Sequence, residues 1–147
     1  MKEELMKRLR DFYAKEENAA LVGVPASDEQ IAEAEKGLNV TFHADYVEFI
    51  KAFGGAFAGI SIHAFSNGSV MGKETVVEWT EEFRQQLAET SLKEQLEDGY
   101  VISMDGSGNP VMIHSTGEVL ICYLDSGETE VLASSFAELI EDQFHEW

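Results

Sequence analysis

The stretch that decides the fold runs from Val101 to Phe136 and reads VISMDGSGNPVMIHSTGEVLICYLDSGETEVLASSF. Three apolar runs rich in Val, Ile and Leu alternate in it with turn clusters rich in Gly, Asp, Ser and Asn. Short apolar runs bounded by such clusters are typical of β-strands. Residues 129–133 follow the last turn, and Ser135 and Glu138 then have the spacing of a helix cap. The stretch predicts a three-strand antiparallel meander that leads into a C-terminal helix.

Helical periodicity predicts three helices before the meander, over residues 1–17, 27–36 and 44–53. Ser27 and Gln30 have the spacing of a capping box, in which each side chain bonds to the backbone N–H of the other residue. Gly37 is expected to take the left-handed conformation that ends a helix. Gly54 and Gly55 end the third helix.

Residues between Gly55 and the meander are harder to assign. Residues 57–65 alternate around Ile60 and Ile62 and predict a strand. Residues 73–89 predict a fourth helix, although residues 75–79 are also compatible with a strand. Residues 90–99 predict a polar loop with a helical turn.

The order of helices, strands and a final helix predicts an α+β fold with a mainly antiparallel sheet. N-terminal and C-terminal helices should pack against the sheet. We expect a single domain over residues 1–147, in which residues 1–26 form an N-terminal helix and linker, and residues 27–140 form the core.

Length and composition indicate a globular protein. Its 147 residues are 44% hydrophobic, which is enough for a sizeable core. No apolar run approaches the roughly 20 residues that a membrane helix needs. The charged stretch Met1–Tyr13 lacks the apolar segment of a secretory signal. Cys122 is the single cysteine, so no disulfide forms within the chain, and we expect a cytoplasmic protein.

The charge is large and unevenly distributed. The net charge is −18, and no Lys or Arg follows Lys93, whereas twelve Asp and Glu residues do. Such a surface repels nucleic acid and anionic membranes, because both require basic groups against phosphate. It would attract a basic protein and speed its association. The alternative, that acidity only keeps the protein in solution, is equally compatible with the charge.

Two patterns in the meander resemble catalytic or metal-binding loops. Residues 125–127 read Asp-Ser-Gly, as around an aspartic protease carboxylate, but these residues are also ordinary turn material. Asp105, Ser107 and Asn109 have the spacing that opens a calcium loop. That loop requires Gly at its sixth position and Glu at its twelfth, where this chain has Pro110 and Thr116. Turns explain both patterns better.

No other constellation favours an enzyme. Gly106-Ser107-Gly108 precedes a strand, whereas a nucleophile elbow precedes a helix. The four histidines have no zinc-ligand spacing, and Cys122 stands alone. His63 and His114 lie in strand-like runs and are expected to be structural. We therefore predict a non-catalytic protein with no metal and no cofactor, while a site assembled from residues distant in sequence remains an alternative.

Four segments in order resemble the SUKH superfamily. They are a helix of the pattern I-x-x-x-E-x-x-L at Ile31–Leu38, an acidic-Tyr-x-x-Phe helix closed by Gly-Gly at Asp45–Gly55, a strand turn at Met104–Pro110, and an A-x-S-F helix start at Ala133–Ile140. The chain departs from the pattern at Phe42-His43, where the family often has Leu-Pro. Together the four segments span most of the chain.

The resemblance implies an α+β fold, no catalysis and a protein partner. Bacterial SUKH members resemble immunity proteins that neutralise polymorphic toxins, often nucleases, and fungal relatives regulate cell-wall synthesis. Because a nuclease carries a basic surface to hold phosphate, a basic toxin domain is the expected partner of this acidic chain. The alternative is a regulatory or scaffold domain that binds a host protein in envelope maintenance.

The expected binding residues lie mostly in the meander turns. Acidic candidates are Asp105, Asp125, Glu128 and Glu130, and the further candidates, as rim or anchor residues, are Asn109, Trp79 and Tyr123. For each of them, a solvated turn residue or a core aromatic is the alternative. The sequence does not predict an oligomeric state.

Overall fold

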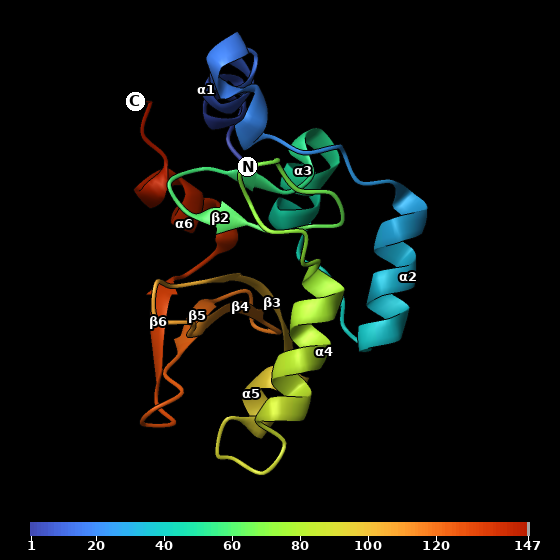
Figure 1. The fold of residues 1–147 in the computed structure, drawn as a ribbon, viewed down its shortest axis with the longest axis vertical. Helices are drawn as coiled ribbons and strands as arrows, with labels where there is room; N and C mark the ends of the chain where they lie inside the picture. The colour runs from blue at the N-terminus through green and yellow to red at the C-terminus, as the bar shows by residue number, and fades with distance from the viewer. Residues whose placement is uncertain (147) are drawn as a thin grey trace.

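The main sheet of the computed structural model, which describes residues 1–146, is four-stranded and antiparallel, and Figure 1 shows it at the lower left, below α6. Its strands, in spatial order, are β3 (Gly99–Met104), β4 (Pro110–His114), β5 (Val119–Cys122) and β6 (Thr129–Ala133). The predicted α+β fold and the meander are confirmed. The sheet has one strand more than the three expected, because residues 129–133 pair with β5. This strand is mostly exposed, so its apolar signal is weak.

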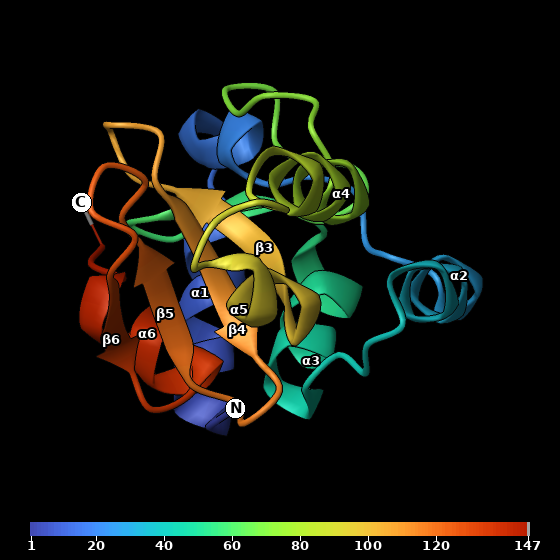
Figure 2. The same ribbon diagram turned by 90° about the horizontal axis from the view of Figure 1, so that it is seen from below.

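Helices cover both faces of the sheet, where the sequence predicted only that helices pack against it (Figure 2). Helices α4 (Val76–Gln86) and α5 (Lys93–Glu97) contribute to a smaller hydrophobic cluster on one face. On the other face, α1 (Glu3–Tyr13), α3 (Ala44–Phe53) and α6 (Phe136–Gln143) contribute to a larger cluster. Helix α2 (Asp28–Leu38) contacts α4.

Successive residues of the strands supply the two clusters alternately. Val101 and Met112 belong to the smaller cluster, whereas their neighbours Ile102 and Ile113 belong to the larger one. Neighbouring side chains of a strand point to opposite faces. A continuous run of buried residues in β3 and β4 therefore marks a sheet covered on both sides.

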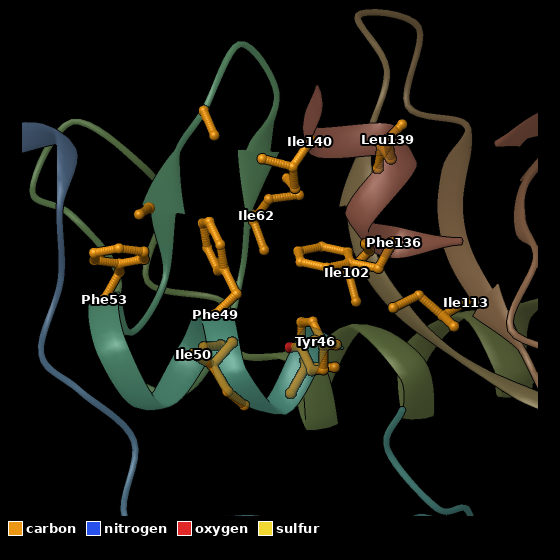
Figure 3. Packing of buried hydrophobic residues seen from close by; sticks show 14 of the residues in the cluster. Tyr46, Phe49, Ile50, Phe53, Ile62, Ile102, Ile113, Phe136, Leu139 and Ile140 are labelled. Atoms are coloured by element: carbon orange, nitrogen blue, oxygen red, sulfur yellow. The ribbon is translucent and has the colours of Figure 1, made fainter. Parts of the chain in front are cut away.

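Helix α3 supplies the centre of the larger cluster (Figure 3). Tyr46, Phe49, Ile50 and Phe53 recur at helical spacing, and each is at most 4% exposed. The ring of Phe136, from α6, meets both Tyr46 and Phe49 edge-on, with centroids 5.4 Å apart in each pair. The predicted bounds of this helix are confirmed, because the apolar stripe and the glycine pair both mark it clearly.

The ends of the first two helices differ from prediction. The capping box of Ser27 and Gln30 is confirmed, but Asn39, with φ of 56°, takes the left-handed conformation instead of Gly37. The predicted helix over residues 1–17 is too long: α1 ends at Tyr13, and a 3₁₀ helix, η1 (Glu16–Leu21), follows. The side chain of Asn18 donates to the Phe12 carbonyl oxygen at 2.8 Å and so caps α1.

The predicted strand over residues 57–65 is wrong. The chain forms a small hairpin of β1 (Ala56–Phe57) and β2 (Ser61–Ile62), apart from the main sheet. Gly59, with φ of +82°, lies in its turn against the Gln143 backbone, and a Cβ there would come 1.9 Å from the Gln143 oxygen. The alternative of a strand at residues 75–79 is excluded, because Thr75 caps α4.

One side chain that the sequence did not single out joins four elements. Arg84 extends from α4 and donates to the carbonyl oxygens of Leu38 and Leu96, both at 2.8 Å. It also donates to those of Gly99 and Glu97, at 3.2 and 3.3 Å. Only a guanidinium presents this many donors in a fixed plane. Partial burial lowers the pKa of Arg84, an effect that Glu97 and Glu81 oppose.

Replacing Arg84 with Lys should lower the free energy of unfolding by about 2 kcal/mol, because an ammonium group cannot reach all four carbonyl oxygens. Urea unfolding measures the change. Arg10→Lys is the matched control, since Arg10 is exposed, and it should change the stability by less than about 0.5 kcal/mol. Equal losses in the two variants would show that the carbonyl contacts of Arg84 contribute nothing.

Candidate partner-binding surface

Two turns of the meander lie side by side at one end of the sheet. The β3–β4 turn spans residues 105–109 and the β5–β6 turn spans residues 123–128. Both turns lie at the same end of the sheet because the strands are antiparallel (Figure 2). The backbone N–H of Leu124 donates to Asn109 Oδ1 at 3.0 Å and joins them. We call residues 105–109 and 123–130 the acidic end. It contains six of the seven predicted site residues.

Asp105 organises the first turn. Its Oδ1 accepts from the backbone N–H groups of Ser107 and Asn109, at 2.9 and 2.8 Å, and its Oδ2 accepts from Asn109 Nδ2 at 3.0 Å. These bonds, first the one from the Asn109 side chain, hold the pKa of Asp105 below its ordinary value. The carboxylate therefore shapes the turn as well as adding negative charge.

Asn109 has a connecting role. Its amide nitrogen donates to Asp105 in its own turn, while its amide oxygen accepts from Leu124 in the neighbouring turn. Both ends of the side-chain amide are thus used inside the protein. Asn109 positions the two turns relative to each other, which makes a direct role at the rim of an interface secondary.

Tyr123 and Glu130 form a pair at the start of β6. The Tyr123 hydroxyl donates to Glu130 Oε2 at 3.1 Å. This bond to an anionic acceptor raises the pKa of the phenol. Glu130 is exposed and Tyr123 is half-buried against the larger cluster, so the pair offers a carboxylate and the edge of a ring to solvent.

Asp125 and Glu128 are the two unengaged carboxylates of the acidic end. Both are exposed. Across residues 1–146 no hydrogen bond or ion pair of either carboxylate is seen; the turn is closed instead by backbone bonds of Tyr123 with Gly127 and Glu128, both of 2.8 Å. A partner that approaches these two carboxylates would break no internal contact.

Trp79 does not belong to this surface, contrary to its prediction as a rim or anchor residue. It is 7% exposed, and its side chain packs from α4 into the smaller cluster. Its ring lies against that of His63, with centroids 3.9 Å apart. His63 in turn bonds to the Glu74 carbonyl oxygen at 2.6 Å. The helical stripe that contains Trp79 faces the core, which the sequence alternative of a core aromatic anticipated.

No basic side chain compensates the acidic end within the described residues. The ion pairs of residues 1–146 involve Lys2, Lys7, Arg8, Lys51, Lys93 and the N-terminus. None of their acidic partners lies in residues 105–109 or 123–130. Within that range, no ion pair therefore neutralises a carboxylate of the acidic end.

A hollow lies at the opposite end of the sheet from the acidic end. It has a volume of about 550 Å³, and Glu35, His43, Asp98 and Tyr100 are among its lining residues. Glu35 accepts from the Phe42 backbone N–H at 2.7 Å, and His43 bonds to the Tyr100 hydroxyl at 2.9 Å. Burial raises the pKa of Tyr100, so its hydroxyl stays protonated at neutral pH and acts as a hydrogen-bonding group.

Sequence reasoning missed the exposed apolar side chains of β6, which follow the acidic end directly in the chain. Val131 is 52% exposed and Leu132 is 36% exposed. Alternation of Glu130 with Val131 was the available signal, since it is typical of a strand with one polar and one apolar face.

Asp105→Asn should lower the melting temperature by a few degrees at pH 7, because the variant loses the charged acceptor of Asn109 Nδ2. Since the folded state lowers the Asp105 pKa from 3.8, this stabilisation is complete above about pH 4 and is lost as the carboxylate protonates at lower pH. Thermal unfolding should therefore show a difference that shrinks in acid. Asp125→Asn, the control, should change little, and a pH-independent difference would contradict the assignment.

Within residues 1–146, no helix is long and apolar enough to cross a membrane. The same residues hold no group of three or more His, Cys, Asp or Glu side chains placed to bind a metal ion.

Comparison with known proteins identifies the family. Residues 25–142 match the SMI1 / KNR4 family (SUKH-1). None of the curated proteins matches the chain. The SUKH family includes immunity proteins and SMI1/KNR4-like regulators and is generally non-catalytic. The matched segment extends from the residues before α2 into α6 and includes the whole sheet. The chain belongs to the SMI1 / KNR4 family (SUKH-1).

Proposed function

We propose that the protein is a cytoplasmic immunity protein that binds a basic toxin domain through the acidic end and so blocks the toxin. The observation that carries the proposal is the pair of unengaged carboxylates, Asp125 and Glu128, in the acidic end, whose own residues include no Lys or Arg. Family membership supports a binding role, because the family includes immunity proteins.

Electrostatics favour a toxin that acts on nucleic acid. Such a toxin needs a basic surface to hold phosphate, and a net charge of −18 attracts that surface at long range. An inhibitor that occupies the basic surface would exclude the substrate without any chemistry of its own. Held by Asp105 and Asn109, the two turns present their charges in a fixed arrangement, which reduces the entropy lost on binding.

Co-expression with the toxin encoded by a neighbouring gene should restore growth, and the two proteins should elute together from a sizing column. Asp125→Lys/Glu128→Lys should weaken the complex by about 10- to 100-fold, because like charges would then face each other across the interface. The control Glu33→Lys/Glu82→Lys makes the same change in net charge on exposed helix residues and should bind almost normally. Unrescued growth with no complex would contradict the proposal, and recovery of a host envelope protein instead would favour a regulatory role.

The association rate should also fall with salt, by roughly tenfold between about 0.05 and 0.5 M, while the dissociation rate changes less. Stopped-flow mixing with the purified toxin domain measures both rates. A flat salt response would remove the electrostatic part of the proposal and leave the family membership alone.

A further inference from the structure

The two outer strands of the sheet, β3 and β6, differ in whether their outer edges are covered. Beside β3, the backbone N–H of His63 donates to the Ile102 oxygen at 2.8 Å, and Thr80 Oγ1 accepts from the Val101 N–H at 2.8 Å. These contacts cover the outer edge of β3. Strand β6 pairs with β5 on one side, and residues 129–132 are all exposed. The free edge of the sheet is therefore at β6.

An exposed edge normally carries charged side chains that discourage pairing with another chain. Here Glu130 is followed by Val131 and Leu132, which are 52% and 36% exposed. The register places Glu130 opposite Ile121 and Val131 opposite Leu120. Because Ile121 and Leu120 belong to different clusters, the Glu130 carboxylate and the Val131 side chain lie on opposite faces of the sheet.

We infer that β6 accepts an extended segment of a basic partner protein as a fifth strand of the sheet. Added strands gain affinity from main-chain hydrogen bonds and specificity from alternate side chains. The segment would place basic side chains beside Glu130 on one face and apolar side chains beside Val131 on the other. The inference rests on the proposed function for the identity of the partner, and it adds how the partner binds.

Charge decides between a basic partner and a second copy of this chain. Pairing β6 with itself would bring the carboxylates of Glu128 and Glu130 of two copies, each with a net charge of −18, close together. Like charges on neighbouring strands destabilise pairing. A strand with Lys or Arg at alternate positions would instead neutralise these carboxylates.

The length of the added strand is limited at both ends. The β5–β6 turn closes through the bond from the Tyr123 N–H to the Glu128 oxygen, just before β6 begins. At the other end, Ser134 bonds to the Glu138 carboxylate, its Oγ at 2.7 Å, and α6 begins at Phe136. The free edge thus corresponds to Thr129–Ala133, in which a register shift leaves Leu132 without a partner in β5. The regularly paired part is Thr129–Val131, and a segment of up to about five residues would fill the edge.

A five-residue peptide, acetyl-Lys-Val-Lys-Val-Lys-amide, is the probe. Titrated to millimolar concentration, it should shift the ¹⁵N amide resonances of residues 129–133. It should also slow, at least about tenfold, the hydrogen exchange of those amides whose N–H groups point away from β5. The same peptide with N-methyl groups on alternate amides, in both possible registers, keeps its side chains but loses main-chain donors, and one register should bind at least about tenfold more weakly. Glu130→Lys and Val131→Asp should each weaken the unmodified peptide about tenfold.

Matched controls separate these effects from changes in overall charge. Val24 is 62% exposed and lies in the segment before α2, so Val24→Asp should leave peptide binding unchanged, as should Glu82→Lys. Equal binding of the methylated peptides, shifts outside residues 129–133, no binding at millimolar concentration, or a dimer that forms through β6 would each overturn the inference.

The same measurements distinguish this inference from the proposed function. A protein that binds the peptide at β6 but neutralises no toxin would retain the inference and lose the function. A toxin that is neutralised equally well by wild type and by Val131→Asp would retain the function and overturn the inference.

Discussion

Burial of strands β3, β4 and β5 on both faces is the constraint on which the rest of the structure depends. A sheet with one exposed face can alternate polar and apolar residues, but β3 and β4 carry apolar residues at successive positions. Each face must then be covered by helices. Helices α1, α2, α3 and α6 contribute to the larger cluster, and α4 and α5 contribute most of the helical residues of the smaller one. With both faces covered, the ends of the hairpins and one strand edge are the parts of the sheet left for a partner.

The acidic end follows from this arrangement. In an antiparallel meander, alternate turns emerge at the same end, so residues 105–109 and 123–128 meet although β4 and β5 lie between them in the chain. Asn109 turns this proximity into a fixed contact through Leu124. Of the acidic groups, Asp105 is used to build the turn, whereas Asp125 and Glu128 are exposed without an internal partner. A binding surface at this end would combine turns held by internal hydrogen bonds with exposed carboxylates.

How much of this the sequence predicts depends on whether the signal is local. Helix α3 and the capping box at Ser27 are confirmed, because a stripe of apolar residues and a cap are each complete within a few residues. Asn39 rather than Gly37 ends α2, since Leu38 is buried at 1% exposure and the helix continues through Gly37 and Leu38. Trp79 lies in the buried stripe of α4, as the alternative of a core aromatic anticipated, whereas its contact with His63 joins segments that are distant in sequence. The exposed edge at β6 and the role of Arg84 also depend on contacts distant in sequence.

The contacts of Arg84 affect which substitutions α2, α5 and the start of β3 can tolerate. All four of its acceptors are backbone carbonyl oxygens, in Leu38, Leu96, Glu97 and Gly99. Main-chain oxygens are present whatever side chain a residue carries, so the anchoring of α5 to α2 and β3 does not depend on which residues occupy most of these positions. A single retained arginine would let the neighbouring segments diversify, and with them the outline of the surface that a partner meets, while the sheet beneath stays in place.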